Sequence, residues 1–145
     1  MATLRKSGGS PARDERRPTR ALTLLASFGY AFAGIRYLIG TQRNAKIHCA
    51  IGLIAVAFGL GFQITQAEWL ALVLTITLVL TLEGVNTAVE AVVDLASPQH
   101  HPLAKVAKDV SAGAVLLGAI ASVVVGLIIF LPRLWPLLLG WLWTS

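Results

Sequence analysis

Three long apolar stretches constrain this chain more than any other feature. Each is close to the ~20 residues that an α-helix needs to cross a bilayer. Of the 145 residues, 56% are hydrophobic and only 13% are charged, which is typical of membrane helices and not of a soluble domain of this size. We therefore expect an all-α membrane protein whose transmembrane helices cover residues 46–63, 69–95 and 108–131 approximately.

The flanking segments differ from these spans. Residues 1–20 are polar and basic, which predicts a disordered tail. Residues 21–42 are apolar but interrupted by Arg36, so that the unbroken part is about 15 residues long, short for a span. This length favours an amphipathic helix on the membrane surface and leaves a spanning helix as the alternative. Residues 132–145 are too short to cross and rich in tryptophan, which predicts an interfacial tail.

The positive charges predict the orientation. Nine of the 12 Lys and Arg residues lie in the first 46 positions. A basic arm can bind nucleic acid, but we expect no such partner because the bulk of the chain is lipid-soluble. The connection between the first two spans has no Lys or Arg, whereas the second connection carries Lys105 and Lys108. The positive-inside rule then places the N-terminus and the second connection in the cytoplasm.

The second span carries a polar stripe at its expected cytoplasmic end. Glu83, Asn86, Glu90 and Asp94 follow one another at spacings of 3, 4 and 4, which places them on one helix face. Carboxylates are costly in lipid and mark function there. The pattern alone leaves three interpretations open: pairing with Lys or Arg in helix packing, a proton or cation pathway, and catalysis with a metal ion.

The second connection favours catalysis. Its sequence, SPQHHPLAKVAKDVSAG, brings histidines and lysines near carboxylates, residue types that suit phosphate and metal handling. The sequence contains neither a G-x-x-x-x-G-K-[ST] loop nor the protein-kinase motifs. Any phosphoryl transfer must therefore use another scaffold.

Three segments of the chain resemble the small bacterial diacylglycerol kinase family. They are EGVNTAVEAVVDL at 83–95, HPLAKVAKDVSAGAV at 101–115 and YAFAGIRYLIGTQRNAKIH at 30–48. The resemblance covers about residues 20–131. It implies a homotrimer in the bacterial inner membrane, with active sites between subunits. ATP and Mg²⁺ would enter from the cytoplasm, and the lipid hydroxyl would come from within the bilayer.

The resemblance also implies residue roles. Glu83 corresponds to the general base that takes the proton of the lipid hydroxyl, and Glu90 to a carboxylate that binds Mg²⁺. Gln42 stands where many members carry a second metal-binding glutamate; its amide oxygen can still coordinate a metal, but without charge. The implied cofactor-binding residues are Tyr30, Gln42, Glu90, Gln99, His100, His101, Lys108 and Asp109, and the implied substrate-binding residues are Arg36, Asn44, Lys46, Glu83 and Asn86.

The segments TQRNAKIH, NTAVEAVVDLASPQHHPLAKVAKD and GLIIFLPRL resemble the undecaprenol-kinase branch of this family. We therefore expect a lipid kinase that favours undecaprenol. One alternative is a diacylglycerol kinase that makes phosphatidic acid. An alternative of another class is a non-enzymatic membrane subunit or a proton-conducting protein.

Overall fold

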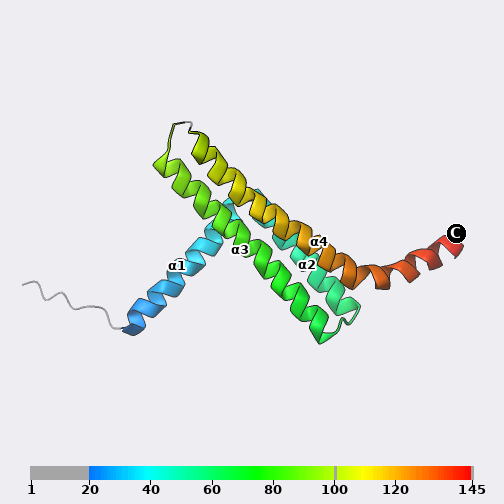
Figure 1. Cartoon of the computed structure of the whole chain (residues 1–145). Coiled ribbons are helices and arrows are strands. Elements are labelled where there is room, and N and C mark those ends of the chain that lie inside the picture. The colour runs from blue at the N-terminus through cyan, green and yellow to red at the C-terminus, as the bar shows by residue number, and fades with distance from the viewer. Residues whose placement is uncertain (1–19, 100, 145) are drawn as a thin grey trace, which may run out of the picture. The chain divides into compact units, whose positions relative to one another are not determined.

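The computed structural model describes residues 20–99 and 101–144, and most of the tail expected at 1–20 lies outside these residues. Four α-helices follow one another in the order α1 (Arg20–Thr41), α2 (Arg43–Gly61), α3 (Gln66–Ala96) and α4 (Pro102–Thr144) (Figure 1). The expectation of an all-α protein is confirmed. The chain divides into two units between Phe32 and Ala33, and the packing described below lies within the second unit.

The number of candidate spans differs from the three expected. Among the described residues, all four helices are long and apolar enough to cross a membrane. The additional one covers Thr23–Thr41 in α1, where Arg36 does not interrupt the helix. Polar side chains in α1 are partly masked, because the hydroxyls of Ser27 and Thr41 donate to backbone carbonyls one turn earlier, at 2.9 and 2.8 Å. A window of α1 thus meets the length and hydropathy of a span although it contains Arg36.

Gln42 separates α1 from α2. Its backbone is extended, with φ −88° and ψ 120°, and its side chain makes no capping hydrogen bond. Its backbone N–H still donates to the carbonyl of Leu38 at 2.9 Å. The expected helix over 21–42 thus ends one residue earlier, and Gln42 becomes the N-cap of α2 with its side-chain amide uncommitted.

The short connection between α2 and α3 begins with a Schellman motif. The N–H of Gln63 donates to the carbonyl of Leu60 at 3.3 Å, and that of Ile64 to the carbonyl of Gly59 at 3.2 Å. Gln63 has a φ of 49°, the left-handed conformation that this motif requires and that glycine usually supplies. Carbonyls at the end of α2 are therefore satisfied within the connection itself.

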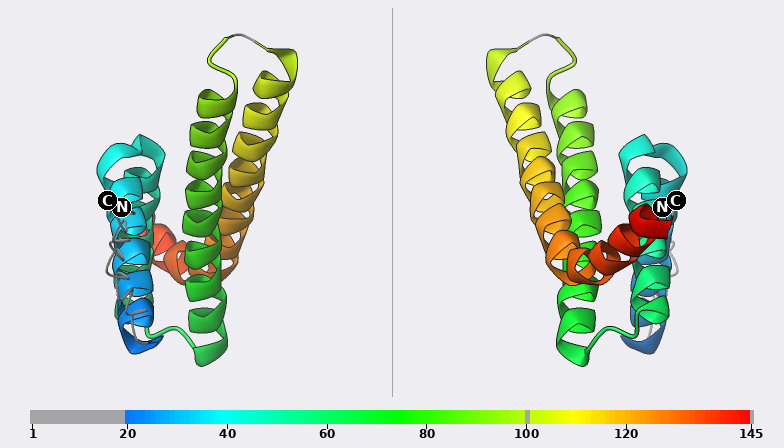
Figure 2. Two further views of the ribbon diagram at one scale, coloured as in Figure 1. Left: turned by 90° about the vertical axis from the view of Figure 1, so that its left-hand side faces the viewer. Right: turned by 90° about the vertical axis from the view of Figure 1, so that its right-hand side faces the viewer.

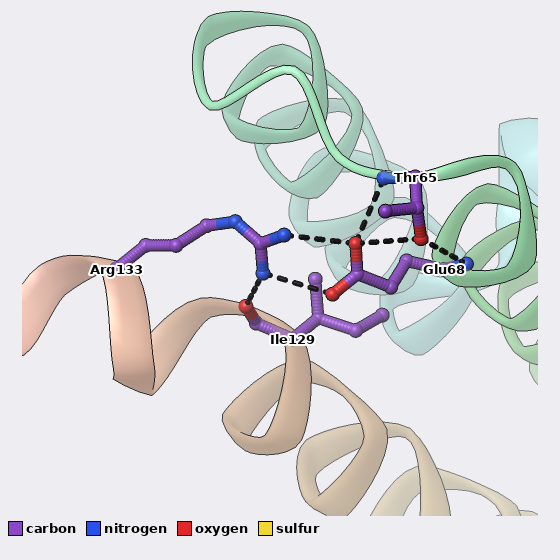
Figure 3. A network of polar contacts seen from close by, with 4 residues as sticks. All are labelled: Thr65, Glu68, Ile129 and Arg133. Atoms are coloured by element: carbon purple, nitrogen blue, oxygen red, sulfur yellow. Dashed lines mark hydrogen bonds and ion pairs between the residues drawn. The ribbon is translucent and has the colours of Figure 1, made fainter.

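The start of α3 is closed by a capping box. The sequence TQAE over residues 65–68 places Thr65 at the N-cap. The Thr65 hydroxyl accepts from the backbone N–H of Glu68, and the Glu68 carboxylate accepts from the backbone N–H of Thr65, as in other S/T-x-x-E starts. Figure 3 shows that Arg133 of α4 reaches the same carboxylate, with its two terminal nitrogens at 2.9 and 2.8 Å from the oxygens of Glu68. This fork joins α4 to the first turn of α3.

The apolar core lies at this end of the second unit. Aromatic rings of α2 and α4 meet there, with centroid distances of 6.0 Å for Phe58–Phe130 and 6.4 Å for Phe62–Phe130. Trp69 packs against the core from the side of α3. The buried members of the core are Ile64, Leu72, Ile129 and Phe130.

Helix α3 lies between its neighbours, packing along α4 and also against α2, and Figure 2 shows α3 and α4 side by side as an antiparallel hairpin. The repeat of small residues at 114, 118, 122 and 126 in the sequence is typical of close helix contacts. Gly118 makes such a contact, since a Cβ there would lie 2.7 Å from Cδ1 of Leu82. Gly126 faces open space instead.

Helix α4 continues far beyond the expected end of the third span at residue 131. It includes Pro132 and Pro136, each of which removes a backbone donor and favours a kink; in Figure 1 the last part of α4 turns away from its earlier direction. The segment expected to be an interfacial tail is thus helical through Thr144. The side chains of Trp141 and Trp143 lie outside the described residues, whereas Trp135 is exposed.

Candidate functional site

The polar stripe of α3 passes from the protein interior to its surface. Glu83 is 2% exposed, Asn86 and Glu90 are half-buried, and Asp94 is exposed. Successive positions on this face are one helical turn apart, so the stripe becomes steadily more accessible toward the α3–α4 connection. A substrate from lipid and one from water could meet along such a gradient.

Glu83 is the buried charged residue of the described part of the chain. Its Oε1 atom has no hydrogen-bond partner there, which is unusual for a buried carboxylate oxygen. The nearest cationic or protonatable group is the imidazole of His48 in α2, whose Nε2 lies 3.4 Å from that oxygen. Sequence reasoning did not single out His48; a histidine inside an apolar span is the signal that could have identified it.

One turn and two turns further along α3, the polar side chains form a chain of hydrogen bonds. Asn86 donates through Nδ2 to Oε1 of Glu90 at 3.0 Å. Ser111 of α4 lies with its hydroxyl 2.7 Å from Oδ1 of Asn86 and 2.9 Å from the carbonyl of Lys108, and donates to either. Asn86 is therefore fixed by α4 and holds Glu90 in turn. Sequence reasoning did not single out Ser111.

A polar hollow of about 320 Å³ lies at the α3–α4 connection. Lys108 forms an ion pair with Asp94 at 2.5 Å, and Lys105 pairs with Asp109. The imidazole of His101 accepts through Nδ1 from the N–H of Leu103 at 3.2 Å, in the first turn of α4. Four of the residues expected to contact nucleotide, Gln99, His101, Lys108 and Asp109, line this hollow together. The fifth residue of this region, His100, lies outside the described residues.

Among the described residues, no hydrogen bond or ion pair links the other expected residues to the stripe. Arg36, Asn44 and Lys46 are exposed, and no hydrogen bond or ion pair joins their side chains to the described part of the chain. Gln42 is half-buried at the N-cap of α2. Tyr30, in the first unit, is 79% exposed.

The described residues place no group of three or more His, Cys, Asp or Glu side chains where they could hold a metal ion. Mg²⁺ does not require such a cage, because it commonly takes one or two protein carboxylates and completes its shell with substrate phosphates and water. Glu90 fits that pattern. Asn86 binds one of its oxygens, and the other remains available for a ligand.

An apolar groove of about 240 Å³ has His48, the neighbour of Glu83, in its lining, whereas Glu83 itself does not line it. It runs over α3 between α2 and α4, from His48 past Val79 and Ile76 to Phe130. Its lining is almost entirely hydrocarbon, so it suits the chain of a lipid and not a polar solute. His48 is thus the link between the groove and Glu83, whereas the polar hollow includes Asp94, at the other end of the stripe.

A family model for prokaryotic diacylglycerol kinase matches residues 29–130. The chain belongs to the prokaryotic diacylglycerol kinase family. A diacylglycerol kinase of Synechocystis is 47% identical over 119 residues, which are 81% of this chain and 68% of that protein. The undecaprenol kinase of Bacillus subtilis is 43% identical over 108 residues, 74% of this chain and 88% of that protein. A diacylglycerol kinase of Escherichia coli is 28% identical over 101 residues.

Family membership decides among the classes of function that the acidic stripe left open. This prokaryotic diacylglycerol kinase family member is an integral membrane lipid kinase, and a kinase takes ATP as co-substrate. The non-enzymatic and proton-conducting alternatives are set aside. The matched region 29–130 contains the stripe, the groove and the polar hollow.

Proposed function

We propose that this kinase transfers the γ-phosphate of ATP to the hydroxyl of a membrane lipid at Glu83, with undecaprenol favoured over diacylglycerol. The observation that carries the proposal is the carboxylate of Glu83. It is buried, one of its oxygens lacks a hydrogen bond, and it adjoins His48, which lines the apolar groove. A lipid hydroxyl can reach this carboxylate without its chain leaving the hydrocarbon.

Glu83 acts as the general base in this scheme. The lipid hydroxyl oxygen attacks the γ-phosphorus and forms the new P–O bond, while the bond from that phosphorus to the β,γ-bridging oxygen breaks and ADP leaves. The hydroxyl proton passes to the Glu83 carboxylate. As in other phosphoryl transfers, little else is required of the protein than positioning and charge neutralisation.

Glu90 is the residue that would hold Mg²⁺. The hydrogen bond from Asn86 fixes its carboxylate, and supporting bonds of this kind orient metal ligands in proteins. Gln42 is proposed as a neutral ligand or a contact just outside the metal, because its amide is not used in capping α2. When bound, Mg²⁺ supplies charge neutralisation on the phosphates.

ATP occupies the polar hollow at the α3–α4 connection. Lys105 and Lys108 can bind phosphate there, although each is now paired with a carboxylate. Nucleotide binding must exchange these partners, so we expect Asp94 and Asp109 to turn away from the lysines when ATP binds. His100, His101 and Gln99 contribute from the connection, and Tyr30 stays a proposed nucleotide contact.

We also propose that α1 lies on the cytoplasmic membrane surface and that three copies assemble. The excess of Lys and Arg near α1 and in the α3–α4 connection supports the orientation. Arg133 lies at the opposite end of α3 and α4, where its charge is paired with Glu68. The exposure of Arg36, Asn44 and Lys46 supports assembly, because these proposed substrate-binding residues could then contact substrate beside a second copy.

Two lipids are candidates. Undecaprenol is favoured by the segments that resemble that branch and by the 88% of the Bacillus subtilis undecaprenol kinase that aligns. Diacylglycerol is the second candidate because the Synechocystis diacylglycerol kinase has the higher identity, 47% against 43%. Both lipids present a hydroxyl at the membrane surface, and the apolar lining of the groove does not distinguish one hydrocarbon chain from the other.

The test is transfer of labelled γ-phosphate from Mg-ATP by the purified protein in mixed micelles. Undecaprenol and diacylglycerol are offered in parallel, and Glu83→Gln is the control. We expect label on undecaprenol that is lost in the control. Label on diacylglycerol alone would overturn the choice of lipid. Undiminished label in Glu83→Gln would overturn the role of Glu83.

A further inference from the structure

The carboxylate of Glu83 has one protein neighbour that no residue role proposed so far includes. His48 of α2 lies with Nε2 at 3.4 Å from Oε1 of Glu83, and the side chains are 21% and 3% exposed. This distance is within reach of an ion pair but longer than a good hydrogen bond. The same Oε1 is the buried side-chain atom without a hydrogen-bond partner in the described part of the chain.

Other polar side chains near Glu83 are already committed. The hydroxyl of Thr87 donates to the backbone carbonyl of Glu83, at 2.9 Å, and not to its carboxylate. Asn86 uses its amide on Glu90 and accepts from Ser111. A buried carboxylate oxygen that lacks a donor is costly. Within the described residues, the imidazole of His48 is the group placed to remove that cost.

The local structure of α2 keeps His48 on this face. Gly52 follows it by one helical turn and lies close to α3, since a Cβ there would be 3.3 Å from Cγ2 of Ile76. Both His48 and Gly52 line the apolar groove. The approach of α2 to α3 therefore presents the imidazole to Glu83 at the entrance of the groove.

We propose that His48 is a positioning residue for the proposed general base. Its Nε2–H donates to Oε1 of Glu83, which leaves Oε2 to receive the proton of the lipid hydroxyl. The bond tightens in the reactive complex, as catalytic hydrogen bonds often do on substrate binding. The inference rests on the proposed role of Glu83. Under it, α3 carries the carboxylate of the base and His48 of α2 orients that carboxylate.

The experiment compares four variants of the full chain in mixed micelles, with kcat and KM measured separately for lipid and for ATP. His48→Leu removes the donor. His48→Gln keeps an N–H donor of similar reach, and His48→Asn keeps an amide that is too short to reach Oε1. Cys49→Ser, a neighbouring change on α2 that does not line the groove, is the matched control.

We expect kcat to fall on the order of 10- to 100-fold in His48→Leu and His48→Asn, the range for loss of a hydrogen bond to a charged group. The KM for ATP should stay unchanged, and His48→Gln should recover most of the lost kcat. Recovery of kcat in His48→Gln would show that the donor at this position orients Glu83 and does not merely fill space. If His48→Leu does not fold, the comparison of His48→Gln with His48→Asn still tests the proposal.

Equal kcat in His48→Gln and His48→Asn would overturn the inference, and so would wild-type kcat in His48→Leu. Glu83→Gln, measured in parallel, tells two failures apart. If Glu83→Gln is inactive while the His48 variants are normal, only the role of His48 is wrong. If Glu83→Gln is active, the proposed base itself is wrong.

Discussion

Two carboxylates of α3, Glu68 and Glu83, have opposite surroundings. Glu68 has both oxygens occupied, with donors from the backbone and hydroxyl of Thr65 and from both terminal nitrogens of Arg133 (Figure 3). Its side chain is 27% exposed. Glu83 is far more buried, at 2%, yet one of its oxygens has no hydrogen bond. A carboxylate whose two oxygens both accept hydrogen bonds holds helices together. A buried carboxylate with an oxygen that accepts none is available for chemistry.

The ends of the second unit repeat this difference. At the α2–α3 connection, the Schellman motif, the capping box and the apolar core satisfy the chain within itself. At the α3–α4 connection, the charged groups face a polar hollow and pair near the surface. The first end stabilises the fold, and under the proposed function the second binds the nucleotide.

The largest effect on activity should come from Glu90→Gln, on the polar stripe of α3. Loss of the charge that is proposed to hold Mg²⁺ should lower phosphoryl transfer on the order of 100-fold or more, and should raise the Mg²⁺ concentration needed for half-maximal activity. Activity is titrated against Mg²⁺ at fixed ATP. An unchanged Mg²⁺ requirement would show that Glu90 is not a ligand.

At the α2–α3 connection, Gly59→Ala should lower the stability and leave the activity unchanged. A Cβ at Gly59 would lie 2.9 Å from Cη2 of Trp69 and 3.1 Å from Cδ1 of Ile64, and overpacking of this kind costs about 1–3 kcal/mol. Gly61→Ala, in the same helix and with open space around it, is the control. Thermal unfolding in detergent should show a lower Tm for Gly59→Ala only. Equal Tm values would mean that the tryptophan ring shifts without cost.

A smaller loss of stability is expected from Arg133→Met, which keeps an apolar stem but removes the fork on Glu68. The Tm should fall by roughly 2–4 °C, with kcat at the wild-type value, because the fork lies at the end remote from the stripe. The measurement is Tm and kcat on the same preparation. A large fall in kcat without a change in Tm would reverse the roles assigned to the two ends.

The smallest effect is a gain at Gln63. Its φ of 49° is unfavourable for a side chain with a Cβ and free for glycine. Gln63→Gly should raise the stability by less than about 1 kcal/mol, since glycine also loses more backbone entropy on folding. A lower Tm would show that the glutamine side chain contributes at this turn.

Much of this contrast is readable in the sequence. The TQAE start at 65–68 predicts a capped helix, and the spacing of Glu83, Asn86, Glu90 and Asp94 places them on one face without any tertiary information. The apolar lengths predict helices, although α1 proved more continuous than its Arg36 suggested. The residue roles remain proposals.

Contacts between helices could not be read in advance. His48 is 35 positions from Glu83 and Ser111 is 25 from Asn86, and only packing of α2 and α4 on α3 brings these pairs together. The partner of Glu68, Arg133, lies 65 residues away. Helical periodicity fixes which face a residue occupies, but the rotation and depth of neighbouring helices depend on contacts such as that of Gly118 with Leu82.

The most direct test removes the charge of each carboxylate in turn, in Glu83→Gln and Glu68→Gln, and measures kcat and Tm for both variants. We predict that Glu83→Gln lowers kcat about 10²- to 10⁴-fold, the contribution of a general base, and leaves the Tm unchanged. Glu68→Gln should lower the Tm and leave kcat unchanged. If Glu83→Gln instead unfolds the protein at a lower temperature while its kcat per folded molecule is retained, Glu83 is a structural residue and the account is contradicted.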